Sequence, residues 1–461
     1  MAIIKSISGI RGTIGGKSGD ALTPIEIVKY TAAFVTFLKG KNPTLNKIVL
    51  GRDARLSGEF ISKIVVGTIQ SLGVDVIDLG LSTTPTVEIA VPDENALGGI
   101  ILTASHNPIQ WNALKLLNEK GEFINDEEGK KVLEIADNED ITFCDVRKIG
   151  TYIEDSTYIK KHIDKILALP LVDKKAIEAK DFSIIIDAVN STGGIAVPML
   201  LEALGVTKIT KLNCEPTGIF AHNPEPLPEN LTEITEQITK KKFDLGIVVD
   251  PDVDRLAFIS DDGSYFGEEY TLVAIAEYVL KNTPGNTVSN LSSTRALRDI
   301  TEKAGGMYFA SAVGEVNVVT MMKTQNAIIG GEGNGGVIYP ELHYGRDSLV
   351  GIALFLSHLA KFNRSSSYLR KTYPNYFISK NKIELTPEIN VDQVLKHIEV
   401  KYAKQQINTI DGLKIDFENE WVHLRKSNTE PIIRIYSESE SETTANHLAN
   451  KIISDIKEFI N

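Results

Sequence analysis

The chain has 461 residues, 42% of them hydrophobic and 24% charged, and a formal net charge of −12. These values are typical of a water-soluble globular protein, and an acidic chain without Lys/Arg-rich runs argues against nucleic acid as the main partner. No apolar run approaches the roughly 20 residues of a membrane helix, the N-terminus lacks a signal-peptide layout, and two distant cysteines form no disulfide framework, so we expect a cytoplasmic protein without membrane contact.

Strand-like and helix-like segments alternate over the first three quarters of the chain. The strand candidates are short apolar runs, each followed by a polar turn, at 47–51, 74–79, 182–187, 245–249 and 287–290. Apolar residues with helical spacing follow at 60–72, at 195–204 and after Arg295. Strand, polar turn, helix, strand is the pattern of parallel α/β units, and three such blocks are visible.

The composition changes after residue 376. Strand candidates at 382–385 and 421–425 flank a predicted helix at 391–402, and a last helix is predicted at 442–459. Polar joints lie near 154–161, 261–267 and 363–373. The sequence therefore predicts an α/β protein with three similar parallel or mixed-sheet domains and a C-terminal α+β domain, at 1–153, 154–256, 257–368 and 369–461.

A serine follows the buried strand candidate at 97–102. The loop reads Thr-Ala-Ser-His-Asn-Pro at 103–108, and its proline restricts the conformation of the tip. Serine is a weak nucleophile at neutral pH and needs a partner, for which His106 and Lys115 are candidates. A polar loop with a chance Ser–His pair is the alternative, so Ser105 is a candidate catalytic residue that other motifs must support.

Three aspartates follow the strand candidate at 245–249. Asp250, Asp252 and Asp254 are two residues apart, and in an extended segment such residues point to one side. Converging carboxylates repel one another unless a cation lies between them, and all-oxygen ligation is the preference of Mg²⁺. Arg255 adds positive charge. An acidic surface turn is one alternative; the start of an aspartyl-phosphate phosphatase is another, but it leaves Ser105 without a role.

A glycine-rich loop at 330–336 follows another apolar strand candidate. It contains Glu332 and Asn334, an acid and an amide that suit the hydroxyl groups of a sugar. Glycines allow backbone to approach a ligand closely. When the loop is taken alone, a plain tight turn is the favoured interpretation.

A basic polar loop lies near the C-terminus, at 425–434. Its hydroxyl, amide and guanidinium groups suit a phosphate. They come from Arg425, Ser427, Asn428, Thr429 and Arg434. The alternative is a solvated hairpin turn.

Three further arginines lie in N-terminal turns. Arg11 stands between Gly9 and Gly12, which indicates close backbone approach. Arg52 and Arg55 follow a strand candidate, and structural ion pairing explains them adequately. Of the three, Arg11 is the better candidate for a functional role.

Together these loops resemble the active-site loops of the α-D-phosphohexomutases, in the same order and with one loop per domain. The segment 103–108 is similar to the phosphoserine loop of that family, and 250–255 to its metal loop. The segment 331–336 is similar to its sugar-binding loop, and 425–434 to its phosphate-binding loop. The resemblance extends over nearly the whole chain and implies four domains around a central cleft.

The resemblance also implies a mechanism. Ser105 would carry a phosphoryl group and ligate Mg²⁺ together with Asp250, Asp252 and Asp254, while Arg11 neutralises the phosphoryl charge. The substrate phosphate would bind Arg425, Ser427, Asn428, Thr429 and Arg434, with further charge from Arg255. Its hydroxyls would meet Glu332 and Asn334, and Lys115 or His106 would handle the proton. A hexose 1,6-bisphosphate would be the intermediate and the activator, and the C-terminal domain would close as a lid.

The chain departs from the commoner pattern of the family at two places. Many members have Ser at Asn334 and His at Gly336, and His343 is a candidate substitute for that histidine; Ala113 stands where glycine is usual. With Gly-Arg-Asp at 345–347, the chain is most similar to the phosphoglucosamine mutase subset. We expect conversion of glucosamine 6-phosphate to glucosamine 1-phosphate by a monomer or homodimer whose partner is a small sugar phosphate. A phosphomannomutase or phosphoglucomutase, a phosphatase and a non-catalytic sensor are the alternatives.

Overall fold

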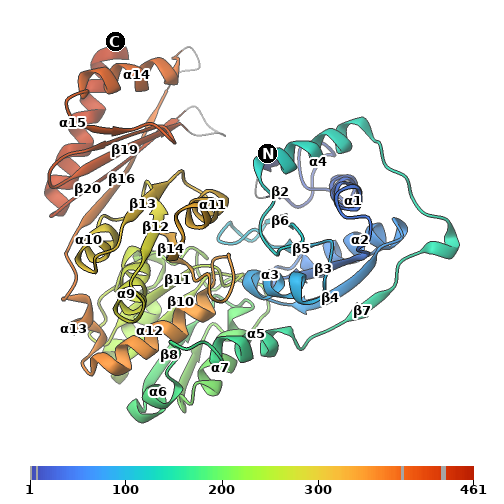
Figure 1. The fold of residues 1–461 in the computed structure, drawn as a ribbon, viewed down its shortest axis with the longest axis horizontal. Coiled ribbons are helices and arrows are strands. Elements are labelled where there is room, and N and C mark those ends of the chain that lie inside the picture. The colour runs from blue at the N-terminus through green and yellow to red at the C-terminus, as the bar shows by residue number, and fades with distance from the viewer. Residues whose placement is uncertain (1–2, 7–8, 386–388, 427–431, 461) are drawn as a thin grey trace. The chain divides into compact units, whose positions relative to one another are not determined.

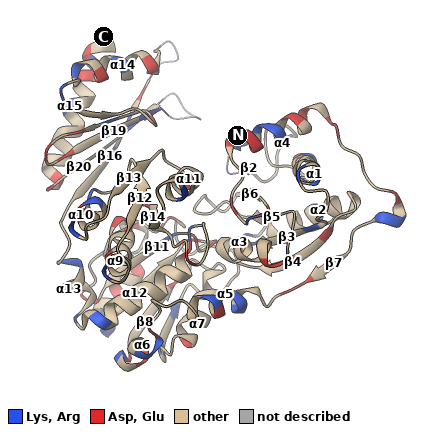
Figure 2. Ribbon diagram, in the orientation of Figure 1, with Lys and Arg blue, Asp and Glu red and all other residues tan. Residues whose placement is uncertain are grey.

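The computed structural model describes residues 3–6, 9–385, 389–426 and 432–460 (Figure 1). The chain divides into two compact units, one made of Met1–Tyr278 with Asn334–Leu369 and the other of Val279–Gly333 with Arg370–Asn461. Acidic and basic residues are interspersed along the helices (Figure 2). Within the described ranges, every helix is too short or too polar to span a bilayer.

The first unit begins with a seven-stranded mixed sheet in the order β1-β2-β6-β5-β3-β4-β7. Its strands are β1 (Ile4–Ser6), β2 (Gly9–Thr13), β3 (Lys47–Arg52), β4 (Asp75–Leu81), β5 (Gly98–Leu102), β6 (Trp111–Leu117) and β7 (Tyr152–Glu154). Strands β5, β3, β4 and β7 run parallel, whereas β6 turns back antiparallel to β5 and pairs with β2. Every residue of β5 is buried, as its unbroken small and apolar sequence indicates.

Helices cover this sheet. They are α1 (Pro24–Lys41), α2 (Gly58–Ser71), α3 (Thr84–Asp93) and α4 (Asp126–Asn138), with a 3₁₀ turn at Val146–Lys148. Apolar side chains of α1 and α2 join those of β3 and β5 in one core cluster. The start of α3 is polar but buried: Thr83 caps the helix by accepting a hydrogen bond from the Thr86 amide, and Thr84 and Thr86 are fully enclosed.

A second sheet in the same unit has the order β11-β10-β8-β9. It contains β8 (Ser183–Asp187), β9 (Lys208–Leu212), β10 (Leu245–Val249) and β11 (Leu256–Ser260). Strands β10, β8 and β9 are parallel, and β11 forms a hairpin with β10. The remaining elements are α5 (Tyr158–Leu167), α6 (Lys174–Lys180), α7 (Gly193–Ala203), a 3₁₀ turn at Pro228–Asn230, α8 (Thr232–Lys241), β15 (Gly336–Ile338) and α12 (Ser348–Phe362). Because α12 is apolar on nearly all sides, it is buried along almost its whole length.

The second unit contains a parallel sheet and an antiparallel sheet. Strands β12 (Asn286–Asn290), β13 (Tyr308–Ser311) and β14 (Ala327–Glu332) are parallel, with β12 between the other two, and α10 (Ala296–Lys303) and α11 (Glu315–Gln325) accompany them. The antiparallel sheet has the order β16-β20-β19-β18-β17. Its elements are β16 (Phe377–Glu384), β17 (Gln406–Asn408), β18 (Leu413–Asp416), β19 (Trp421–Lys426), β20 (Ile432–Ser439), α14 (Val391–Lys401) and α15 (Glu442–Ile460). Helices α9 (Glu268–Asn282) and α13 (Ser366–Arg370) lie where the chain passes between the units.

The predicted fold class, three α/β sheets followed by an α+β domain, is confirmed. The predicted helices at 60–72, 195–204, 391–402 and 442–459 correspond to α2, α7, α14 and α15 to within two residues at each end. The strand predicted at 382–385 is the end of a longer strand, β16. The polar joint predicted at 154–161 contains the start of α5, whose apolar face is buried.

Candidate active site

Ser105 lies in the loop between β5 and β6, at the end of a buried strand. The backbone of Ser105 has a φ of 49°, and the residue is only 8% exposed. The Ser105 amide donates to Thr103 Oγ1 at 2.9 Å, and that hydroxyl donates to Asp53 Oδ2 at 2.6 Å. A non-glycine residue in the left-handed region costs energy and persists when its surroundings fix it. The loop therefore holds the serine in one strained conformation.

The guanidinium of Arg55 holds the same loop in place through hydrogen bonds to its backbone. Arg55 is 1% exposed and pairs through Nε with Asp53 at 3.0 Å. Its two terminal nitrogens donate to four backbone carbonyl groups, those of Ser105, Asn107, Pro108 and Trp111. The ion pairing predicted for Arg55 is thus confirmed. Arg52 donates instead to the Asp53 carbonyl at 3.4 Å.

The metal-loop candidate is a hairpin turn, which corrects the expectation of an extended segment. Val249 pairs with Leu256, so residues 250–255 connect the two strands. Val253 has a φ of 64°, and its amide donates to the Asp250 carbonyl at 3.2 Å. The carboxylates of Asp250, Asp252 and Asp254 nevertheless converge, with one oxygen from each lying within 4.8 Å of the others. The turn, rather than β-strand alternation, brings them together.

Each carboxylate in this acid triad has its own partners. Asp250 Oδ2 accepts from Ser105 Oγ at 2.7 Å, and its Oδ1 accepts from the backbone amides of Asp254 and Arg255. Asp252 Oδ2 accepts from Thr84 Oγ1 at 2.5 Å and from Lys115 Nζ at 2.6 Å. The serine loop and the acid triad are therefore in direct contact within the first unit.

The triad has the properties of a cation site. All three aspartates are 0% exposed, and Asp252 Oδ1 and Asp254 Oδ1 are buried without a hydrogen-bond partner among the described residues. Burial, together with the charges of Asp252 and Asp254, raises the pKa of Asp250 well above its ordinary value. A set of oxygen donors with free lone pairs and excess negative charge fits a hard divalent cation.

Two titratable side chains flank Ser105. His106 Nδ1 lies 3.3 Å from Ser105 Oγ, and burial, with a further contribution from the charge of Arg255, lowers the pKa of His106 to about 2. Burial disfavours the ammonium of Lys115, but the charges of Asp252 and Asp254 outweigh it, and the pKa of Lys115 lies above its ordinary value. His106 is therefore neutral and Lys115 positively charged beside the serine. Arg255 Nη1 contacts Glu225 Oε1 at 3.3 Å.

Arg11 lies on β2, which pairs with β6, the strand that follows the serine loop. It pairs with Ala113, and residues that are paired or two apart share a face of a sheet, so Arg11 and Lys115 lie on the same face. A Cβ on Gly9 would lie 2.0 Å from the Leu114 carbonyl oxygen, which confirms the close backbone approach predicted there. Burial lowers the pKa of Arg11.

The second half of the sugar-loop candidate contacts the acid triad's hairpin. Gly335 has a φ of 84° and its carbonyl accepts from the Leu256 amide at 3.0 Å. A Cβ on Gly336 would lie 2.4 Å from Arg346 Cδ, and Arg346 Nη2 donates to Asp254 Oδ2 at 2.8 Å. Arg346 was not among the predicted site residues, although the Gly-Arg-Asp motif that contains it is present in the sequence. His343, the suggested substitute for a histidine at 336, contacts Asp347 and Glu88 instead.

The remaining candidates lie in the second unit, apart from Asn334, whose Oδ1 accepts from the Gly336 amide at 3.2 Å. Glu332 is 4% exposed and accepts from Asn290 Nδ2 at 2.9 Å and from the Gly314 amide at 3.0 Å. A side-chain amide and a backbone amide therefore fix its carboxylate in place.

The phosphate-loop candidate begins and ends on paired strands. Ser427, Asn428 and Thr429 lie outside the described residues. Arg425 pairs with Arg434 across β19 and β20, and Arg434 pairs with Lys382 on β16. These three residues, which we call the cationic row, share one face of the sheet, although Asp411 offsets part of the charge by contacting Arg425 Nε at 2.9 Å. Like charges directly opposite one another are unfavourable, and an anion relieves them.

Four sequence patterns, described as domains I, II and III and the C-terminal domain of phosphoglucomutase/phosphomannomutase, match the chain in order. They cover residues 3–142, 160–263, 267–376 and 382–454. The chain belongs to this family of α-D-phosphohexomutases. The family identified from the sequence motifs is thereby confirmed, and with it an activity as an intramolecular phosphotransferase of hexose phosphates.

Relatives of this phosphohexomutase align over almost its full length. A phosphoglucomutase/phosphomannomutase of Thermococcus kodakarensis is 36% identical over 94% of this chain and 95% of its own. A phosphoglucosamine/phosphogalactosamine mutase of Sulfurisphaera tokodaii is 33% identical over 96% of this chain and 97% of its own. The crystal structure of a phosphoglucomutase/phosphomannomutase family protein from Burkholderia thailandensis has the same fold, with a TM-score of 0.83, 23% identity and coverage of 99% and 98%.

Proposed function

We propose that this phosphohexomutase moves a phosphoryl group between O6 and O1 of glucosamine phosphate, with Ser105 as the phosphate carrier. The observation that carries the proposal is the 2.7 Å contact of Ser105 Oγ with Asp250 inside a buried acid triad. Arg55 and Thr103 fix the serine before any substrate arrives, and such preorganisation is what phosphoryl transfer requires of a protein.

The proposed reaction has two balanced transfers. A free hydroxyl oxygen of the sugar monophosphate attacks the phosphorus on Ser105; the new P–O bond forms, the P–Oγ bond breaks, and the hydroxyl proton passes to the neutral imidazole of His106. Lys115, already protonated, donates a hydrogen bond to the transferring group and has no free lone pair to accept that proton. The resulting hexose 1,6-bisphosphate turns end for end. Its other phosphate then returns to Ser105 Oγ, and the proton returns to the departing sugar oxygen.

We assign the acid triad and Ser105 to a Mg²⁺ ion, because the donors are oxygens and two triad oxygens are without a hydrogen-bond partner. When bound, the ion supplies positive charge beside the phosphoryl group. The protein's own cations have the same role: Lys115 and Arg346 contact the triad, and Arg11 shares the sheet face of Lys115. A phosphoserine carries about −1.5 to −2 charge, so these cations stabilise it in an acidic chain.

The substrate contacts are assigned by chemistry. Glu332, whose carboxylate is held by two amide donors, and Asn334 take the sugar hydroxyls. Arg255 and the cationic row supply charge for the phosphate, together with the hydroxyl and amide groups predicted from the sequence at Ser427, Asn428 and Thr429. We also propose four domains, with the boundaries predicted from the sequence. We further propose that the enzyme is cytoplasmic and acts as a monomer or homodimer.

We favour glucosamine as the substrate because the Asn334/Gly336 loop and the 345–347 motif most resemble those of the phosphoglucosamine mutase subset. The Sulfurisphaera relative bears a related name, whereas the Thermococcus relative's name supports a phosphoglucomutase or phosphomannomutase as the second candidate. A phosphatase that uses Asp250 as nucleophile is disfavoured, because it gives no role to Ser105, whose hydroxyl is held 2.7 Å from that carboxylate.

Intact mass and kinetics test the proposal together. Part of the purified enzyme should be heavier by one phosphoryl group, and kcat/KM should be at least about tenfold higher for glucosamine 6-phosphate than for the glucose or mannose phosphates. Chelation should abolish turnover and Mg²⁺ should restore it. A higher kcat/KM for glucose or mannose phosphate establishes the second candidate; loss of phosphate to water instead of isomerisation contradicts both.

A further inference from the structure

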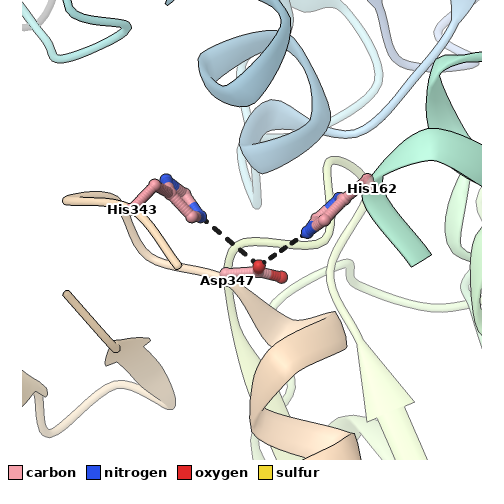
Figure 3. Close-up of side chains that lie close together, drawn as sticks. All are labelled: His162, His343 and Asp347. Carbon is pink, nitrogen blue, oxygen red and sulfur yellow. Dashed lines mark hydrogen bonds and ion pairs between the residues drawn. The ribbon is translucent and has the colours of Figure 1, made fainter. Parts of the chain in front are cut away.

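A second cluster of ligating side chains lies in the first unit and takes no part in the mechanism above. It joins His162 on α5, His343, and Asp347 at the start of α12 (Figure 3). Asp347 Oδ2 lies 2.9 Å from His162 Nε2 and 3.3 Å from His343 Nε2, so both imidazole nitrogens point at one carboxylate oxygen.

Each of these side chains is oriented by a partner on its other side. His162 Nδ1 lies 3.0 Å from Thr86 Oγ1, and His343 Nδ1 lies 3.4 Å from Glu88 Oε2, both on α3. Asp347 Oδ1 caps α12 by accepting from the amides of residues 349 and 350. A hydrogen-bond acceptor behind each histidine and a second anchor on the carboxylate form the outer shell that orients metal ligands in proteins.

We propose that His162, His343 and Asp347 bind a transition-metal dication of the Zn²⁺ class. Zn²⁺ bonds His nitrogen and carboxylate oxygen at about 2.0–2.2 Å in tetrahedral geometry, which separates neighbouring ligand atoms by roughly 3.3 Å. The observed separations from Asp347 Oδ2 are 2.9 and 3.3 Å. All three ligand atoms lie within 4.8 Å of one another, so rotations of the side chains can place them around one ion.

Charge balance favours the same occupant. Asp347 and Glu88 bring two carboxylates into a region where the side chains of His162 and Asp347 are 0% exposed and that of Glu88 is 1%. A dication bound to Asp347 Oδ2 neutralises that carboxylate while the imidazoles stay neutral. The side chain of His343 is 12% exposed and provides the way in.

This cluster and the acid triad call for different metals. Imidazole donors suit Zn²⁺, whereas the all-oxygen triad suits Mg²⁺. The two sites are joined through short connections: Arg346, next to Asp347, contacts Asp254, and Thr84, on the same helix as Thr86, contacts Asp252. The amide of Ser348 also donates to the Val253 carbonyl at 3.2 Å. The metal would connect α3, α5 and the start of α12. Through these elements it would position Arg346 and Thr84, which contact the triad.

Co²⁺ binding to the full-length enzyme, saturated with Mg²⁺, tests the proposal, because Co²⁺ in a Zn²⁺ site gives visible absorption bands. One equivalent should bind with tetrahedral bands. His343→Gln and His162→Gln should each weaken binding beyond the about 10–100-fold that loss of an outer partner costs, and Glu88→Gln should weaken it within that range. His447→Gln, on the exposed face of α15, is the matched control and should bind as the parent does.

Thermal unfolding supplies a second readout. Zn²⁺ should raise the unfolding temperature of the parent and of Asp254→Asn, whose triad is impaired, but not that of His343→Gln. If His162→Gln fails to fold, His343→Gln and Glu88→Gln carry the test. Absence of Co²⁺ bands in the parent, bands that survive in His343→Gln, or bands lost in Asp254→Asn alone would show that the cluster is a hydrogen-bonded network without a metal.

Discussion

The Ser105 site and the cationic row hold their charges in opposite ways. Around Ser105, the three aspartates are fully buried, and Lys115, Arg346, Thr84 and backbone amides contact them within 3.2 Å. In the cationic row, Arg434 and Lys382 are exposed, and their alignment follows from strand register alone.

The difference follows from what each region does in the proposed reaction. A phosphoryl group in transfer is stabilised by groups that need no reorganisation, so its surroundings are packed and connected. A phosphate that only has to be held, and later released, is served by exposed cations, each of which contributes about 1 kcal/mol or less in water. Mutations should therefore have large effects on turnover in the first region and small effects on KM in the second.

Ser105→Ala should have the largest effect. Turnover should fall by at least about 10³-fold, because the group that accepts and returns the phosphate is lost, and the phosphorylated species should disappear from the intact-mass spectrum. The unfolding temperature serves as the control and should stay near that of the parent. Retained turnover would show that Ser105 does not carry the phosphate, and it would contradict the proposed difference between the Ser105 site and the cationic row.

Arg55→Lys should have the next largest effect, although Arg55 does not contact the triad. A lysine cannot serve four carbonyl groups with a planar fork, so the free energy of unfolding should fall by about 1–3 kcal/mol and turnover by about 10²-fold as Ser105 shifts. Chemical denaturation and steady-state kinetics measure the two effects. Arg52→Lys, which removes one weak bond to Asp53, is the matched control; equal effects of the two variants would contradict the argument.

Gly336→Ala tests whether Arg346 needs the space beside it. A methyl group 2.4 Å from Arg346 Cδ should push the guanidinium away from Asp254 and lower kcat about tenfold. Gly40→Ala, where a Cβ meets no atom within 4 Å, is the control for glycine replacement. Unchanged kcat in Gly336→Ala would show that the Arg346–Asp254 contact is dispensable.

Lys382→Ala should have the smallest effect. Loss of one exposed charge from the cationic row should raise KM about two- to fivefold, leave kcat unchanged, and lose its effect at high salt. Lys457→Ala, an exposed lysine on α15, should not change KM. A fall in kcat instead of a rise in KM would place Lys382 among the residues that act on the transferring group.

Much of this arrangement could be predicted from the sequence because the chain repeats a local rule. An apolar run that ends in a polar loop places side chains at the end of a buried strand, and both Ser105 and Asp250 follow such runs. Spacing of the aspartates also predicted their convergence, but for the wrong reason, because the 250–255 segment turns back on itself. A six-residue connection between antiparallel strands is set by pairing with β11, which the spacing does not reveal.

The partners of these loops could not be predicted. Arg55 acts on carbonyl groups 50 to 56 residues away, and Arg346 acts on Asp254 at a separation of 92 residues. His162, His343 and Asp347 come from segments about 180 residues apart, and a lone histidine on a predicted helix gives no sign of such a neighbour. These contacts arise when sheets and helices pack against one another, and local residue patterns do not reveal which distant segments meet.

Gly336 and Arg346 also bear on how the enzyme can change over evolutionary time. The glycine leaves a space that the arginine side chain fills, so the histidine common elsewhere in the family cannot enter without displacing it. A larger residue at 336 alone would clash with Arg346, and replacement of Arg346 alone would remove its contact with Asp254. The two positions are therefore coupled through packing, and we expect a larger residue at 336 to be accepted only together with a smaller residue at 346.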